Sequence, residues 1–264
     1  MLRVEHISKT FNPGTINEKK ALDALSLHLA PGDFATVIGG NGAGKSTLLN
    51  AVAGTWPVDA GRISIDGADV TALPDFRRAP YIGRVFQDPM LGTAPDMWLE
   101  ENLALAQRRG KPRGLRWGIS RQERDLYRER LAALGLGLEE RMTTKVGLLS
   151  GGQRQAVTLL MAALQQPKLL LLDEHTAALD PATAKKVLEL SERIVTENGL
   201  TTLMITHNMT DAIALGNRLI MMHQGHIILD ISGEEKRRLT KQELMERFFA
   251  LSGVQEETDS VLLS

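Results

Sequence analysis

The sequence predicts an α/β fold with parallel strands, and three features predict it. The apolar run 34–38 is followed by a glycine-rich loop and then by residues 45–53, whose apolar positions have helical spacing. Two further apolar runs, 169–172 and 202–205, have the length expected for strands that are buried on both faces of a sheet. Residues 181–196 between them have the pattern of a crossover helix. Strands that alternate with helices in this way are typical of α/β proteins.

The remaining elements follow along the chain. Alternating Leu25, Leu27 and Leu29 predict a half-buried strand before the first apolar run. The stretch of about residues 95–165 has helical patterning and few strand runs, which favours a helical subdomain inserted in the α/β core. The sequence then predicts a hairpin from residues 218–222 and 226–229, one charged amphipathic helix from residues 234–249, and a loose tail. We expect the main domain to end at residue 230 and the C-terminal part to begin at residue 231.

Composition and charge exclude several classes of protein. The chain has 264 residues, 31 Lys plus Arg against 32 Asp plus Glu, and no cysteine. A net charge of -1 gives no global attraction to nucleic acid or to acidic membranes. The lack of cysteine excludes disulfides, thiolate catalysis and cysteine zinc sites. The charged N-terminus is unlike a secretory leader, and the longest apolar runs are shorter than the roughly 18 to 20 residues of a spanning helix.

A phosphate-binding loop is predicted at residues 39–46, which match the pattern G-x-x-x-x-G-K-[ST] between a strand and a helix. Glycines let backbone N–H groups surround phosphate oxygens, and the helix N-terminus adds positive potential. The Lys45 ammonium is expected at the β- and γ-phosphates, and Ser46 is expected to bind magnesium. The nucleotide-binding residues predicted here are Gly39, Asn41, Gly42, Ala43, Gly44, Lys45, Ser46 and Thr47.

Two carboxylates end the buried strand 169–172. Asp173 and Glu174 should lie at the carboxyl edge of the sheet, where α/β proteins bind ligands. We expect Asp173 to reach magnesium directly or through water. Glu174 is expected beside the γ-phosphate, where its carboxylate orients or deprotonates the attacking water.

A further motif adds a family resemblance. Leu149-Ser150-Gly151-Gly152-Gln153 lies between the phosphate loop and the Asp173-Glu174 strand end. In this order the three motifs resemble those of the ATP-binding cassette (ABC) ATPases, over about residues 2–230. The resemblance implies a P-loop NTPase (RecA-like) core, an N-terminal antiparallel β subdomain and the helical subdomain inserted at about residues 95–165, with residues 1–230 as the ATPase domain and 231–264 as a C-terminal helix and tail.

The resemblance also implies roles for single residues. Gln87 resembles the glutamine that touches magnesium and the lytic water, and His207 resembles the switch histidine on the γ-phosphate. Asp180 lies in a segment that resembles the D-loop. Phe11 resembles the aromatic residue that stacks on adenine, although an ordinary core residue at a strand end is the alternative for it.

The mechanism implied by the family needs two copies of the chain. Ser150, Gly151, Gly152 and Gln153 would complete the nucleotide site of a second copy, so that two ATP molecules with Mg²⁺ lie in a head-to-tail homodimer. ATP would favour closure of this dimer and hydrolysis its opening. One departure from the common pattern is His175, which follows Glu174 where proline is usual; a loop residue without a special role is the favoured interpretation, and a polar contact behind the site is the alternative.

The expected function is that of the ATP-hydrolysing subunit of a bacterial importer of an amino-acid-like solute. The resemblance implies transmembrane permease subunits as partners, an extracytoplasmic substrate-binding protein as a further one, and a location on the inner face of the cell membrane. Permease helices should dock on residues 86–103, where Met90, Met97 and Trp98 are candidate contacts and core packing is the alternative for each. A soluble ABC ATPase of an assembly or repair complex, such as an iron–sulfur scaffold, is the alternative function.

A basic cluster lies between Arg108 and Arg130. Such a cluster can attract nucleic acid or anionic lipid, at about 1 kcal/mol per residue near a charged membrane. A solvated helical face is the favoured interpretation, so no nucleic-acid partner is expected.

Overall fold

The computed structural model describes residues 1–111 and 118–252. Residues 112–117 and 253–264 lie outside the described residues, and the expected C-terminal tail falls largely on the latter. The chain divides into two compact units, of which the first combines residues 1–78 with the C-terminal part from residue 200 and the second comprises residues 79–199. The inserted helical subdomain expected at about residues 95–165 remains a prediction.

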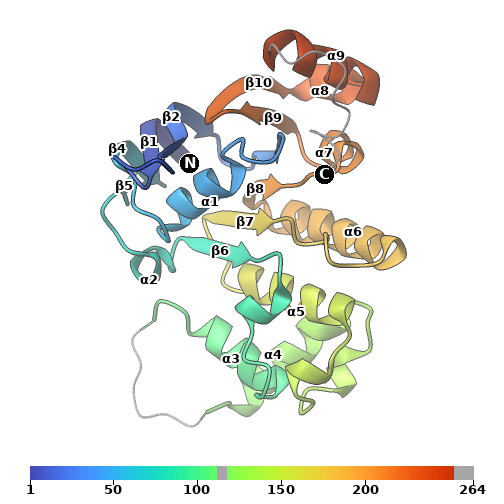
Figure 1. Ribbon diagram of the computed structural model, residues 1–264. Coiled ribbons are helices and arrows are strands. Elements are labelled where there is room, and N and C mark those ends of the chain that lie inside the picture. Colours follow the sequence, from blue (N-terminus) through green and yellow to red (C-terminus); the bar gives the residue numbers. More distant parts are fainter. Residues whose placement is uncertain (112–117, 253–264) are drawn as a thin grey trace. The chain divides into compact units, whose positions relative to one another are not determined.

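The first unit contains an antiparallel sheet of N-terminal strands. Their order is β2-β1-β4-β5, and they are drawn in blue to teal in Figure 1. The expected alternation around Leu25 is confirmed, because Leu25, Leu27 and Leu29 are buried while the residues between them are exposed. The strands are β1 (Leu2–Phe11), β2 (Lys19–Leu29), β4 (Ala60–Ile65) and β5 (Ala68–Asp69), and a short helix, α2 (Asp75–Arg78), follows them.

The first unit also contains the strand that leads into the phosphate loop. This strand, β3 (Phe34–Ile38), is buried at every position and pairs in parallel with β8 (Thr201–Ile205) on one side and β9 (Arg218–His223) on the other. Helix α1 (Lys45–Ala53) follows the loop, as the sequence predicts, and ends at Gly54 in the left-handed conformation. Helix α7 (Met209–Ala214) follows β8 after a short connection.

The C-terminal part of the first unit confirms the hairpin and corrects the helix. Strand β10 (His226–Ser232) pairs antiparallel with β9. The single helix expected over residues 234–249 is in fact two, α8 (Gly233–Arg238) and α9 (Lys241–Ser252), which lie beside β10 in Figure 1. Thr240 and Glu243 exchange side-chain and backbone hydrogen bonds that start a new helix. The helical apolar spacing therefore hid a break that the T-x-x-E pattern indicates.

The second unit contains two parallel strands and its helices. Strands β6 (Ile82–Val85) and β7 (Leu169–Asp173) pair from Ile82–Leu169 to Val85–Leu172. The apolar run 169–172 is thus a buried strand, as predicted. The α-helices are α3 (Leu99–Gln107), α4 (Arg121–Ala132), α5 (Gly151–Ala163) and α6 (Pro181–Asn198), and the short 3-10 helices are η1 (Pro89–Gly92), η2 (Leu138–Glu140) and η3 (Val146–Leu148).

Capping residues explain where the helices of the second unit begin. Ser120 and Ser150 each open a helix through a capping box with the residue three positions later. Asp180 caps α6, Pro181 occupies its first turn, and Gly199 ends it in the left-handed conformation. Helices α3, α4 and α5 enclose an apolar core that includes Leu103, Tyr127 and Leu131, all fully buried. No helix within residues 1–111 and 118–252 is long and apolar enough to span a membrane.

Candidate functional site

The phosphate loop connects β3 to α1 in the first unit. Gly39 has φ +151, and a methyl group on its Cα would lie 2.2 Å from the backbone oxygen of Met222. Gly44 has φ +102, and the same addition would lie 2.5 Å from the backbone oxygen of Ala21. Backbone packing therefore requires glycine at both positions, quite apart from any ligand. The first unit alone sets the path of this loop.

Lys45 begins α1 and turns back over the loop. Its side chain is buried, and Nζ donates hydrogen bonds to the backbone oxygens of Gly39 at 2.6 Å and Gly40 at 3.2 Å. These contacts hold the ammonium beside the loop backbone, where the sequence predicts it. Ser46 is exposed and Thr47 is buried, both in the first turn of α1. Asn41 and Gly42 form the exposed rim of the loop, and Ala43 is buried.

Phe11 lies at the end of β1, also in the first unit. Its ring is 5.1 Å from the ring of Trp56 in an edge-to-face arrangement, and Nζ of Lys9 is 5.8 Å from the ring centre. Trp56 lies in the connection that follows α1. The ring is thus held in a defined orientation at the sheet end, which is compatible with stacking on a base. The adenine-stacking role of Phe11 remains a prediction.

His207 lies in the first unit at the same sheet edge as the phosphate loop. Strands β3 and β8 are parallel neighbours, so the loop after Ile38 and the connection after Ile205 leave from the same edge. The backbone N–H of Thr206 donates to the oxygen of Val37 at 3.1 Å. Asn208 caps α7 through its side chain, which fixes the residue just after His207. His207 itself is exposed.

The second unit places Gln87, Asp173 and Glu174 at one edge of its strand pair. Gln87 comes two residues after β6, and Asp173 is the last residue of β7, whose parallel pairing with β6 reaches Val85–Leu172. The amide of Gln155 on α5 donates to the backbone oxygen of Phe86 at 3.3 Å. This bond ties the segment of Gln87 to the helix that begins at Ser150.

Asp173 has a neighbour that the sequence analysis missed. Burial raises the pKa of Asp173, and the negative charge of Glu174 adds to this, while Arg84 acts in the opposite direction. A guanidinium nitrogen of Arg84 lies 3.5 Å from a carboxylate oxygen of Asp173, and the guanidinium is 4.4 Å from the centre of the Phe86 ring. The sequence shows only that Arg84 lies in the run before Gln87; its pairing with Leu171, which brings it close to Asp173, is set by the register of β6 and β7.

Glu174 has a backbone conformation that is unusual for its residue type. Its φ is +42, in the left-handed region that glycine prefers. Its backbone oxygen accepts a hydrogen bond from the N–H of Ala177 at 2.9 Å, which closes a turn directly after the strand. Such strain often accompanies functional positions, because surrounding structure must hold it. Glu174, the residue that the sequence predicts to activate water, thus has a constrained backbone.

His175 is not the loop residue without a role that the sequence favoured. The side chain is 1% exposed, and Nε2 lies 2.9 Å from Oγ of Ser191 on α6. Since that hydroxyl donates to the backbone oxygen of Val187, the imidazole must donate from Nε2. Burial lowers the pKa of His175 to about 4. The neutral ring therefore anchors the turn after Glu174 to α6.

The segment that resembles the family signature forms the first turn of α5. Ser150 Oγ accepts a hydrogen bond from the N–H of Gln153 at 3.3 Å, and the Gln153 side chain accepts one from the N–H of Ser150 at 3.2 Å. This reciprocal pair is a capping box. Gly151 and Gly152 follow within it, with Ser150 exposed. The predicted donors are thus gathered at a helix N-terminus, which favours anions.

Gly152 has a packing role as well. A methyl group on its Cα would lie 2.2 Å from Cγ2 of Thr183 on α6. Asp180 caps that helix by accepting a hydrogen bond from the N–H of Thr183 at 3.1 Å. Hydrogen bonding from the Thr183 side chain, and then from its backbone, lowers the pKa of Asp180. The signature segment and the Asp180 segment are therefore in contact within the second unit.

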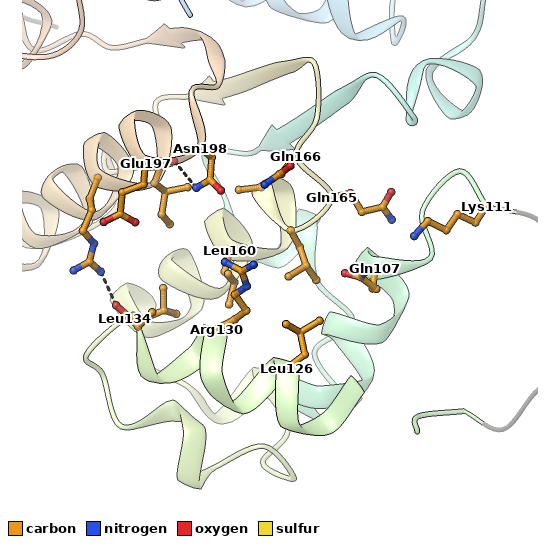
Figure 2. Close-up of a pocket in the computed structure, with 15 residues that line it drawn as sticks. Gln107, Lys111, Leu126, Arg130, Leu134, Leu160, Gln165, Gln166, Glu197 and Asn198 are labelled. Atoms are coloured by element: carbon orange, nitrogen blue, oxygen red, sulfur yellow. Dashed lines mark hydrogen bonds between the residues drawn. The ribbon is translucent and has the colours of Figure 1, made fainter. Parts of the chain in front are cut away.

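A pocket of about 550 Å³ in the second unit contains none of the predicted site residues. Figure 2 shows it between the ends of α3, α4, α5 and α6, with Arg130, Lys111 and Glu197 among its lining residues. Two other members of the basic cluster are paired, since Arg108 contacts Glu123 at 2.7 Å and Arg128 contacts Asp125 at 3.2 Å. Arg113 and Arg116 lie outside the described residues.

Comparisons with known proteins agree with these motifs. The family model described as "ABC transporter" matches residues 22–177. The chain is 44% identical to the tyrosine transport ATP-binding protein of Clostridioides difficile, over 94% of this chain and 98% of that protein. It is 36% identical to the methionine import ATP-binding protein of Bartonella henselae, over 86% of this chain and 64% of that protein.

Solved structures give the same result. A nucleotide-free ATP-binding cassette from an ABC transporter superimposes with a TM-score of 0.76 at 29% identity, covering 97% of this chain and 99% of that one. A dimeric cassette in a post-hydrolysis state bound to ADP and phosphate superimposes with a TM-score of 0.74 at 30% identity, covering 88% of this chain and 98% of that one.

Proposed function

Because this chain belongs to the ABC transporter family and is an ATP-binding ATPase subunit of it, we propose that it powers import of an amino-acid-like solute. The observation that carries the proposal is the ordered set of motifs at strand ends, in a chain that aligns with nearly the whole length of a tyrosine transport subunit. Relatives named for methionine and sulfonate import support import as the direction. They favour transport over a soluble assembly complex as the function.

Each unit carries residues with proposed nucleotide roles. Lys45 and the loop backbone would bind the β- and γ-phosphates, and Phe11 would stack on adenine. Glu174 would act as the general base for the attacking water, His207 would contact the γ-phosphate, and Gln87 would orient the water. Ser150, Gly151, Gly152 and Gln153 would serve the nucleotide of a second copy, together with Asp180. These assignments rest on the motifs and on the local geometry of each unit.

Magnesium fits the residues proposed to hold it. Ser46, Gln87 and Asp173 offer hydroxyl, amide and carboxylate oxygens, which are the ligand types that Mg²⁺ prefers. Burial raises the pKa of Asp173, and a nearby cation would counteract this effect by stabilising the charged carboxylate. When bound, the ion would neutralise phosphate charge.

The proposed permease contact lies on the segment 86–103. Met90 and Trp98 are exposed, at 37% and 45%, and Met97 is partly buried. Leu91, which the sequence analysis did not name, is 70% exposed beside Met90. Neighbouring exposed apolar side chains are common at protein interaction sites. This surface supports the proposal that the chain lies on the inner face of the membrane through permease subunits, and the proposal includes an extracytoplasmic binding protein that supplies solute.

A substitution at Glu174 tests the chemistry. Glu174→Gln should retain ATP binding but reduce turnover at least about 100-fold, as expected for the loss of a general base. It should also accumulate as a dimer with ATP and Mg²⁺, detectable by analytical ultracentrifugation. In cells the same variant should abolish uptake of labelled tyrosine by the assembled system. Unchanged turnover would reject the role of Glu174, whereas normal tyrosine uptake with loss of another solute would correct the substrate class.

A substitution at Leu91 tests the permease contact. Leu91→Asp should reduce recovery of membrane subunits with the tagged chain from detergent-solubilised membranes, because a charge would enter an apolar interface. ATP turnover of the isolated chain should not change, since the side chain is exposed. Leu251 is an exposed leucine of the first unit, and Leu251→Asp is the matched control. Recovery of soluble partners alone with the unsubstituted chain would instead support the assembly alternative.

A further inference from the structure

The β1–β2 hairpin carries three lysines that differ in their partners. Nζ of Lys9 lies 2.9 Å from a carboxylate oxygen of Asp59, and Nζ of Lys20 lies 2.5 Å from one of Asp23. Within the described part of the chain, the Lys19 side chain has no hydrogen bond or ion pair. Two of the three positive charges are thus compensated by carboxylates, and the third is not.

The acid next to Lys19 in the chain is already used elsewhere. A carboxylate oxygen of Glu18 accepts a hydrogen bond from the backbone N–H of Gly14 at 2.6 Å. The backbone N–H of Glu18 donates to the oxygen of Thr15, so Glu18 closes the hairpin loop. It is therefore directed to the loop and not to Lys19.

Lys19 reaches the phosphate loop of the same unit. A methyl group placed on Cα of Gly42 would lie 3.0 Å from Nζ of Lys19. The ammonium thus lies directly over the backbone of the loop, on its exposed rim. Gly42 has φ +79, and its lack of a side chain leaves the space that the ammonium occupies.

This arrangement places two ammonium groups on one short loop. Nζ of Lys45 is bonded to the oxygens of Gly39 and Gly40, and Lys19 adds its charge at Gly42. The N-terminus of α1 adds further positive potential at the same place. Like charges on one short loop repel each other, and an anion bound at the loop offsets this repulsion. The positive potential therefore favours a phosphate group on the side of the loop that Lys19 covers.

The strand register indicates which end of a nucleotide Lys19 would contact. Lys19 is the direct partner of Phe11 across the β1–β2 pair. Phe11 is the residue proposed to stack on adenine, and Lys45 is the one proposed for the β- and γ-phosphates. Lys19 therefore lies between Phe11, which is proposed to contact the base, and the loop that is proposed to bind the phosphates.

We propose that Lys19 binds the phosphate chain of the nucleotide at its adenosine end, as a second cation of the phosphate site. The proposal rests on the proposed nucleotide roles of Phe11 and Lys45. It assigns a binding function to a hairpin residue outside the motifs described above. Because the α- and β-phosphates are present in both ATP and ADP, Lys19 should contribute equally to the binding of both nucleotides.

Nucleotide titrations of the full-length chain test this assignment. Lys19→Met keeps the length of the side chain and removes its charge, and Lys20→Met is the matched control because Lys20 pairs with Asp23 on the same strand. Calorimetric titration with Mg²⁺ and ADP should show about tenfold weaker binding for Lys19→Met, the effect expected for loss of a charge-assisted hydrogen bond. ATP should show the same loss in a Glu174→Gln background. Lys20→Met should bind both nucleotides as the unsubstituted chain does.

Two further measurements separate charge from structure. Lys19→Arg should restore most of the affinity, and Lys19→Met should show a weaker dependence of the dissociation constant on KCl concentration, because screening acts on the missing charge. Equal ADP affinities for Lys19→Met and Lys20→Met would overturn the proposal. A loss confined to ATP would also overturn it, because it would place the ammonium at the γ-phosphate. Failure of the phosphate site itself is distinguishable, since Lys45→Ala would then also bind nucleotide normally.

Discussion

The phosphate loop and the signature segment both combine glycines with a helix N-terminus, but they differ in what completes them. In the phosphate loop, Lys45 bonds to the loop backbone and Gly39 and Gly44 fit against backbone of the same unit. At the signature segment, Ser150 caps its own helix, and Gly152 packs against Thr183. The first is a proposed phosphate site that one copy of the chain completes. The second caps and packs within its own copy, and its proposed phosphate contact is with the nucleotide of another copy.

The largest expected effects are on nucleotide binding and on dimer formation, and they test which segment depends on a second copy. Lys45→Ala should weaken binding of ADP to the isolated chain by at least about tenfold, because a cation at the phosphates is lost. Ser150→Asp should leave ADP binding unchanged, since aspartate also caps a helix. In the Glu174→Gln background, however, it should prevent the ATP-dependent dimer, because its charge would repel the partner's γ-phosphate.

Ultracentrifugation and calorimetry on the same preparations measure both quantities. Ser150→Asn is the matched control, since asparagine also caps a helix and adds no charge. Dimer formation by Ser150→Asp at the ATP concentration that saturates the parent variant would contradict the proposed contact in trans. A loss of ADP affinity in Ser150→Asp would mean that the segment also serves the nucleotide of its own copy.

Features set by local patterns could be predicted from the sequence, whereas features set by contacts between separate elements could not. The strands at 34–38, 169–172 and 202–205 and the phosphate loop follow from local patterns, because buried parallel strands and glycine loops have short-range signals. The role of His175 does not, since its partner Ser191 is on another element and burial is set by tertiary packing. The break at Thr240 could have been found from its capping pattern. The contact of Lys19 with Gly42 could not, because it joins separate elements.

Acid should act on the second unit through His175. The pKa of this imidazole is about 4 in the folded chain and about 6.5 in an unfolded one, so below pH 6.5 the unfolded state binds more protons. The free energy of unfolding should therefore fall as pH falls from 6.5 toward 4, by about 2 kcal/mol at pH 5. Urea unfolding at pH 7 and pH 5 measures this change.

A variant without the titrating ring isolates the contribution of His175. His175→Asn keeps a side-chain N–H donor and does not titrate, so its stability should fall less between pH 7 and pH 5. The difference between the two pH dependences, and not the absolute stability, gives the effect of the imidazole. Equal slopes for both proteins would show that His175 does not couple folding to pH, and would remove the argument that a buried neutral ring anchors the turn after Glu174.

The smallest effect concerns the packing role of a signature glycine. Gly152→Ala should lower the free energy of unfolding by about 1 to 3 kcal/mol, because the added methyl group would meet Cγ2 of Thr183. Thr183→Ser removes that methyl group, so the double variant should recover much of the loss, which a double-mutant cycle in urea measures. Full recovery of stability without recovery of ATP-dependent dimerisation would show that Gly152 serves both packing in its own copy and phosphate in the other. Additive losses would instead show that the two helices do not meet at this pair, and would contradict a packing role of Gly152 within its own copy.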